Sequence, residues 1–204
     1  MSAPIRVLLA DDQDLVRGAL AALLSLEHDL EVVAEVGRGD EVVDAVRRTG
    51  PDVALLDVEM PGLDGIAATA AVRAACPGTR VLIVTTFGRP GYLRRAIQAG
   101  ADGFVVKNTP ATQLADAVRR VHAGLRVVDA TLALDSFVAG ESPLTPRETD
   151  VLRAAQDGAS VATIARRVSL SEGTVRNHLS AAIGKTEAAN RAEAARIAES
   201  NGWL

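Results

Sequence analysis

The sequence predicts an α/β protein: a five-stranded, parallel, doubly wound sheet followed by a small all-α unit of four helices. Three observations predict this fold class. Short apolar runs alternate with amphipathic stretches over residues 5–123. Most of these runs show little polar alternation, as strands covered on both faces do. Beyond residue 142 only helical periodicity remains. Repeated strand–helix units form parallel sheets with right-handed crossovers.

The five expected strands are the apolar runs 5–10, 30–36, 52–57, 80–85 and 103–106. Between them, apolar residues recur at helical spacing, as in Leu114, Ala117, Val118 and Val121. Glycine and proline separate the units at Gly50-Pro51, Pro61-Gly62 and Pro77-Gly78. Residues 1–123 are therefore expected to form the α/β domain.

Residues 124–142 have no sustained period and are expected to be a linker. Residues 143–204 contain four signals for the start of a helix, at Thr145, Ser160, Ser171 and Asn190. Gly184 could cut the third of these helices short. The second and third helices, joined at Ser169-Leu170, have the spacing of a helix-turn-helix.

Composition narrows the class of protein. The chain of 204 residues carries a net charge of −4, which argues against a nucleic-acid coat over its whole length. Residues 143–204 hold 8 Lys/Arg and 7 Asp/Glu, so this part is slightly basic, as expected where phosphates are met. There is one cysteine, and no apolar run reaches the ~20 residues of a membrane span. We expect a cytoplasmic protein without membrane insertion.

Reactive side chains follow several of the expected strands. Asp11-Asp12 follow the first strand, Asp57 ends the third, Thr85 ends the fourth and Lys107 follows the fifth. The carboxyl ends of parallel strands form the ligand-binding edge of such a sheet. Gathered carboxylates repel one another unless a cation lies among them, and oxygen ligands suit Mg²⁺. With a lysine and a hydroxyl beside them, these carboxylates predict a phosphoryl-transfer site.

These motifs resemble, in the same order, the receiver domain of bacterial two-component response regulators. The resemblance covers residues 4–123 and rests on Asp11-Asp12, Asp57 with Met60-Pro61-Gly62, Asp64-Gly65, Thr85 and Gly103–Lys107. It implies a flavodoxin-like (CheY-like) sheet and phosphorylation of Asp57 by a sensor histidine kinase. It also implies Mg²⁺ held by Asp11 or Asp12, Asp57 and the backbone carbonyl of Glu59. Thr85 and Phe104 would be the switch pair. One departure is that Asn108-Thr109 separate Lys107 from Pro110.

The C-terminal part resembles the LuxR-type helix-turn-helix of NarL/FixJ regulators over residues 143–200. The matching segments are Leu144–Leu152, Ile164-Ala165 and Leu170–His178. The third helix would enter the major groove of double-stranded operator DNA. With Val175, Leu179 and Ile183 facing inward, the residues expected to contact DNA are Thr174, Arg176, Asn177, His178, Ser180 and Lys185.

Two departures bear on DNA affinity. Val161-Ala162-Thr163 replace the Asn-Lys-Glu that commonly begins the second helix, and Ser180 stands where some relatives carry a basic residue. Fewer cations weaken binding per monomer, so we expect reliance on a homodimer. The segment Thr174–Ser180 and the ending Gly202-Trp203-Leu204 look like the DesR-like branch.

Together these features predict a phosphorylation-activated transcription regulator that dimerises and then binds operator DNA. It is not expected to be an enzyme beyond promoting its own phosphorylation and dephosphorylation. Two alternatives stay open. One is a Mg²⁺-dependent aspartyl-phosphate hydrolase, in which Glu59 would be the second carboxylate. The other is a phospho-switched protein-interaction module without DNA binding.

Overall fold

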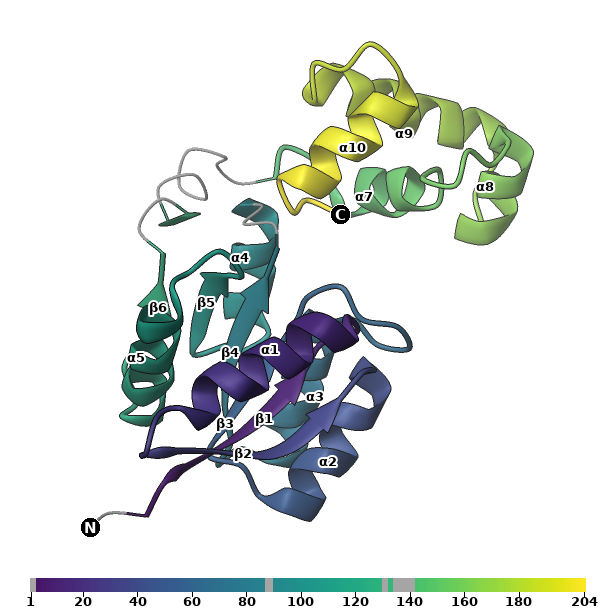
Figure 1. Ribbon diagram of the computed structural model, residues 1–204. Helices are drawn as coiled ribbons and strands as arrows, with labels where there is room; N and C mark the ends of the chain where they lie inside the picture. Colours follow the sequence, from purple (N-terminus) through teal and green to yellow (C-terminus); the bar gives the residue numbers. More distant parts are fainter. Residues whose placement is uncertain (1–2, 87–89, 130–131, 134–141) are drawn as a thin grey trace. The chain divides into compact units, whose positions relative to one another are not determined.

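The computed structural model describes residues 3–86, 90–129, 132–133 and 142–204. Among these residues the chain divides into two compact units: 3–86, 92–129 and 132–133 form the first, and 90–91 with 142–204 form the second. The first unit is a sheet with helices, and the second, here called the helical unit, contains helices alone among its described residues (Figure 1). Within the described ranges, every helix is too short or too polar to cross a membrane.

The sheet of the first unit is parallel throughout, in the order β2-β1-β3-β4-β5-β6. Its strands are β1 (Ile5–Ala10), β2 (Leu30–Val36), β3 (Val53–Leu56), β4 (Arg80–Thr85), β5 (Gly103–Val106) and β6 (Val127–Val128). The five expected strands are present, but the expected number is wrong because β6 adds a sixth. This strand lies in the stretch 124–142 expected to be a linker. A strand of two residues is too short to show a hydrophobic period in the sequence. The strand β6 is therefore recognised only from its pairing with Gly103 and Phe104.

Helices cover both faces of the sheet. They are α1 (Asp14–Ser25), α2 (Val42–Thr49, preceded by the 3-10 turn η1, Gly39–Glu41), α3 (Gly65–Ala75), α4 (Pro90–Gln98) and α5 (Ala111–His122). One core joins Leu8, Leu56, Ile83 and Phe104 to α2, α3 and α4. The other joins Leu9, Leu55, Leu82 and Val105 to α1 and α5. Neighbouring strand residues thus pack into opposite cores, which explains the continuous apolar runs.

The helical unit contains α7 (Pro146–Arg153), α8 (Val161–Val168), α9 (Glu172–Lys185) and α10 (Arg191–Ser200). All four begin at the expected caps, where the side chains of Thr145, Ser160, Ser171 and Asn190 accept backbone N–H groups. Apolar residues from all four helices meet in one core. Gly184 lies near the end of α9 as expected: the helix continues through it and ends one residue later, at Lys185.

Candidate functional site

The reactive residues expected from the sequence meet at one edge of the first unit, at the carboxyl ends of the strands. Asp11 follows β1, Asp57 follows β3, Thr85 ends β4 and Lys107 follows β5. Backbone hydrogen bonds keep these ends level: Asp57 N–H donates to the Ala10 carbonyl at 2.8 Å, and Lys107 N–H to the Thr85 carbonyl at 2.7 Å. The parallel sheet therefore brings together residues that lie up to 96 positions apart in the chain.

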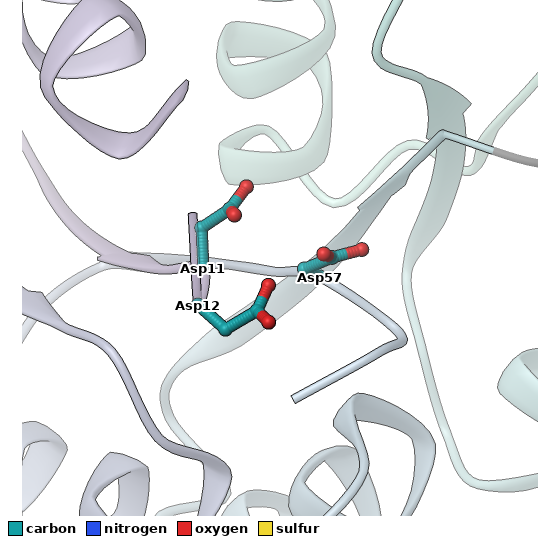
Figure 2. Close-up of side chains that lie close together, drawn as sticks. All are labelled: Asp11, Asp12 and Asp57. Atoms are coloured by element: carbon teal, nitrogen blue, oxygen red, sulfur yellow. The ribbon is translucent and has the colours of Figure 1, made fainter. Parts of the chain in front are cut away.

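Three carboxylates lie close together at this edge. Asp11, Asp12 and Asp57 each offer one oxygen, and these oxygens all lie within 4.8 Å of one another (Figure 2). Asp11 and Asp57 are buried, whereas Asp12 is exposed. Carboxylate oxygens with one open, solvent-facing side are the kind of donor set that a hard divalent cation takes. The cluster could therefore hold a metal ion.

Lys107 is the counter-charge of the two buried carboxylates. Its Nζ lies 2.7 Å from Asp11 Oδ2 and 2.8 Å from Asp57 Oδ2, and its side chain is 11% exposed. Burial opposes the charge of Lys107, but the hydrogen bonds to Asp11 and Asp57 outweigh it and raise the pKa of Lys107. One ammonium against three carboxylates leaves negative charge for a further cation to neutralise.

Asp57 itself is held firmly. Burial raises the pKa of Asp57 above its ordinary value, in spite of the hydrogen bond and the positive charge of Lys107. Its Oδ1 accepts the Val58 N–H at 2.7 Å.

The backbone at Asp57 leaves no room for a side chain at position 65. A residue other than glycine there would place its Cβ 1.8 Å from the Asp57 carbonyl oxygen, so this position requires glycine. The Asp64-Gly65 motif thus has a steric reason that the sequence does not disclose.

Arg17 on α1 contacts the loop that follows β1, a role that was not expected from the sequence. Its Nη1 donates to the Asp11 carbonyl oxygen at 2.6 Å, and its Nη2 lies 2.6 Å from the Asp14 carboxylate. The Nε of Arg17 also lies 3.7 Å from Glu35 Oε2 on β2. The guanidinium therefore braces the loop that carries Asp11 and Asp12. A lone arginine among the residues of an amphipathic helix gives no sequence signal for such a role.

Thr85 and Phe104 are diagonal neighbours on one face of the sheet. Ile83 pairs with Phe104, and Thr85 lies two residues beyond Ile83 on β4. Both are buried, and Phe104 is part of the core shared with α2, α3 and α4. Glu59 is exposed, and its side chain is not among the three carboxylates that approach one another.

The candidate DNA-binding residues lie on α9, outside the core of the helical unit. Val175 and Leu179 are buried as expected, and Ile183 is partly buried. Five of the expected DNA contacts that neighbour these residues are exposed or partly exposed, as contact with a partner requires: Thr174, Arg176, Asn177, His178 and Ser180.

The polar contacts of these residues differ. Arg176 pairs with Glu172 one turn earlier, at 2.9 Å. The Thr174 hydroxyl lies 2.8 Å from that of Ser171, which caps the helix. Lys185 differs from the others because its Nζ lies 2.7 Å from the buried carboxylate of Glu148 on α7. The structure thus leaves five of the six expected contacts facing outward from α9 and ties the sixth to another helix.

Known proteins resemble both units. The model of the response regulator receiver domain matches residues 7–119, and that of the luxR family of bacterial regulatory proteins matches residues 142–198. Transcriptional regulatory protein DesR of Bacillus subtilis (strain 168) is 41% identical, over 98% of this chain and 99% of its own. Response regulator RamR of Streptomyces coelicolor is 40% identical over 100% of both chains.

A solved structure agrees with these relatives. The crystal structure of the response regulator ChrA, from a heme-sensing two-component system, is 32% identical, covers 100% of both chains and has a TM-score of 0.61. The family models span most of the two units, and the relatives span the whole chain. The chain therefore belongs to the two-component response regulators of the NarL/FixJ type, transcription regulators that join a receiver domain to a LuxR-type DNA-binding domain.

Proposed function

We propose that Asp57 accepts a phosphoryl group from a sensor histidine kinase, and that the phosphorylated chain dimerises and binds operator DNA. The observation that carries the proposal is the setting of Asp57. Its side chain is 3% exposed and lies beside Asp11, Asp12 and the ammonium of Lys107. A structural ion pair would need only one carboxylate for one lysine. Three carboxylates favour a site built around a cation and a transferred phosphoryl group.

The chemistry assigns each residue a part. A carboxylate oxygen of Asp57 attacks phosphorus, a P–O bond forms, and the bond from phosphorus to the donor imidazole nitrogen breaks. Lys107, 2.8 Å from Asp57 Oδ2, is placed to neutralise an oxygen of the incoming group. The Thr85 hydroxyl at the end of β4 would donate a hydrogen bond to another oxygen of the phosphoryl group.

Asp11, Asp12, Asp57 and the backbone carbonyl of Glu59 would hold Mg²⁺. When bound, this ion supplies charge neutralisation during the transfer. The exposed side chain of Glu59 disfavours a hydrolase, because an acid/base carboxylate would have to face Asp57. The chain is therefore proposed to hold the phosphoryl group as a signal instead of turning over small phosphate esters.

The proposed switch runs through Thr85 and Phe104. Their places on one face of adjacent strands make it possible for a movement of the Thr85 hydroxyl toward the phosphoryl group to change the packing of the Phe104 ring. The dimer-competent state is then favoured by phosphorylation, as a shift between two states that both exist beforehand.

The proposed DNA surface is the outward side of α9. Arg176 can pair with guanine or a phosphate and Asn177 with adenine, while Thr174, His178 and Ser180 supply further polar contacts. The pair between Arg176 and Glu172 is largely exposed, so exchanging Glu172 for DNA loses little. Because both proposed partners, the kinase's phosphodonor histidine and operator DNA, are met in the cytoplasm, we place the protein there.

Asp57→Asn tests both halves of the proposal in one preparation. The variant should lose Mg²⁺-dependent labelling by acetyl phosphate, and its DNA binding should no longer respond to that reagent. The control is Asp116→Asn, because Asp116 is an exposed carboxylate on α5 whose ion-pair partner is Arg120 and not a residue of the site. Undiminished labelling of Asp57→Asn would move the phosphoacceptor elsewhere. Labelling without any effect on DNA binding would instead favour the protein-interaction alternative.

A further inference from the structure

Lys185 connects two helices of the helical unit. It lies in the last turn of α9, and its Nζ is 2.7 Å from Glu148 Oε2 on α7. The same oxygen accepts the Thr145 N–H at 2.7 Å, and Glu148 N–H donates to the Thr145 hydroxyl, which closes a capping box at the start of α7. The end of the α9 helix is thus fastened to the first turn of α7.

The two cations of α9 are not equally available to DNA. Arg176 and Glu172 have side chains that are 62% and 49% exposed, so water solvates either one when they part. The Lys185 side chain is 37% exposed, but its partner Glu148 is only 7% exposed. Moving the Lys185 ammonium to a phosphate would leave a buried carboxylate with one donor fewer, which is unfavourable.

Two further observations support the conclusion that the ammonium of Lys185 stays bound to Glu148. Burial favours the neutral form of Glu148, but the hydrogen bonds from Lys185 and Thr145 outweigh it and lower the pKa of Glu148. Thr186, the next residue, is buried and its hydroxyl donates to the Ala182 carbonyl at 2.8 Å. The end of α9 is therefore held by the Lys185–Glu148 pair and by the buried side chain of the next residue, Thr186.

We propose that Lys185 is a positioning residue and not a contact to the DNA backbone. By bonding Glu148, it fixes the C-terminal end of α9 on α7 and so holds the outward side of α9, with Arg176 and Asn177, at the angle that DNA requires. The inference rests on the proposed DNA binding and assigns a role within it.

Thermal unfolding tests whether the two residues act together. The chain has one tryptophan, Trp203, which packs against the core of the helical unit, so its fluorescence reports unfolding of that unit. Lys185→Met and Glu148→Gln should each lower the midpoint by about 5 °C, and the double variant should be no worse than the worse single one. Arg196→Met is the control, because Arg196 is an exposed cation with a surface partner. Fully additive losses would overturn the proposal.

The salt dependence of DNA binding separates positioning from phosphate contact. The full chain is titrated onto a duplex selected by the wild-type protein from a random-sequence pool. A positioning role predicts that Lys185→Met weakens binding about tenfold with an unchanged slope of log Kd against log salt, and that Lys185→Arg restores affinity. A slope reduced by about 1, or stronger binding by Glu148→Gln, would identify a phosphate contact and overturn the proposal.

The wild-type titration also tests the proposed function by itself. If the wild-type chain selects no duplex, DNA binding fails before any variant is compared, and the positioning role fails with it. If the wild-type chain binds and only the slope or the Glu148→Gln result contradicts the expectation, the DNA-binding proposal stands and the positioning role alone is withdrawn.

Discussion

The site around Asp57 and the outward side of α9 use charged residues in opposite ways. Asp57 and Asp11 have side chains that are 3% and 4% exposed, and they share one lysine. The side chains of Arg176 and Glu172 on α9 are 62% and 49% exposed, and they form an ion pair with each other. A group that takes part in chemistry has to be held in place before the reaction. A group that recognises DNA has to be free to leave its partner in the protein.

The difference also appears in the backbone beneath the side chains. At Asp57 the main chain is fixed by the hydrogen bond to Ala10 and by the close approach of Gly65. On α9, a Cβ added at Gly184 would have no atom within 4 Å. A Cβ added at Gly173 would meet only the Ser171 hydroxyl, at 3.8 Å. The first site should therefore be sensitive to small steric changes, and the second should tolerate them.

Gly65→Ala should have the largest effect, because the new Cβ would lie 1.8 Å from the Asp57 carbonyl oxygen. We expect a loss of about 3 kcal/mol in the free energy of unfolding, together with loss of labelling at Asp57. Urea denaturation followed by the fluorescence of Tyr92, the single tyrosine and a buried residue of the first unit, measures the stability. Gly18→Ala on α1 is the control and should stabilise by about 0.5–1 kcal/mol, since nothing lies near its Cβ position. Normal stability and labelling of Gly65→Ala would show that the site around Asp57 is no more sensitive to steric changes than α9.

Lys107→Met should be nearly as damaging, because it leaves the carboxylates of Asp11 and Asp57 buried without their counter-charge. We expect a loss of roughly 3 kcal/mol, which added Mg²⁺ partly restores by placing positive charge among the same oxygens. Urea midpoints with Mg²⁺ and with a chelator measure both effects. Arg120→Met removes an exposed cation of α5 and should change little. Equal midpoints for Lys107→Met and the wild type would show that the buried charges do not depend on Lys107.

Arg176→Ala should alter DNA binding and leave stability unchanged. We expect a loss of about 1–3 kcal/mol in binding to a selected duplex, with labelling at Asp57 intact. The urea midpoint should move by no more than the equivalent of about 0.5 kcal/mol, because the pair with Glu172 is exposed. Gel shifts and denaturation of one preparation measure both quantities. Unchanged DNA affinity would place the recognition surface elsewhere.

Ser169→Gly should stabilise the helical unit. Ser169 ends α8 with φ 55°, in the left-handed region where glycine is favoured over residues with a Cβ. We expect a gain of about 1 kcal/mol, seen as a higher midpoint in Trp203 fluorescence, with DNA affinity unchanged. A fall in affinity would show that the turn between α8 and α9 is as restrictive as the backbone at Asp57.

Asp29→Asn should show the smallest effect, although it lies in the first unit. The hydrogen bond from Arg119 lowers the pKa of Asp29 to about 2, but both side chains are about a third exposed. Because the folded pKa lies below the unfolded one, the stabilisation is present above pH ~4 and is lost as pH falls toward 2. The difference in urea midpoint between wild type and variant should shrink over that range. A constant difference would mean that the carboxylate charge is not involved.

Some residues of the site and the fold could be predicted from the sequence, and others could not. Asp11, Asp57, Thr85 and Lys107 were predictable, because each directly follows or ends an apolar run and parallel strands end at one edge. The four helix caps were predictable because capping is local. The sixth strand was not, since its partner β5 lies elsewhere in the chain. Arg17 was not either, since an arginine in an amphipathic helix gives no sign of the preceding loop carbonyl that it binds.

The sequence by itself determined the α/β class, the helical C-terminal part and the identity of the reactive groups, because periodicity, capping and strand-end position are local properties. Only the tertiary structure decided which charges are buried and with whom they pair. Lys107 and Lys185 look alike as lysines near the end of an element, yet one neutralises two carboxylates of the candidate site and the other is held by Glu148. Burial depends on chain segments far apart in sequence, so the energy of an ion pair cannot be inferred from its residues alone.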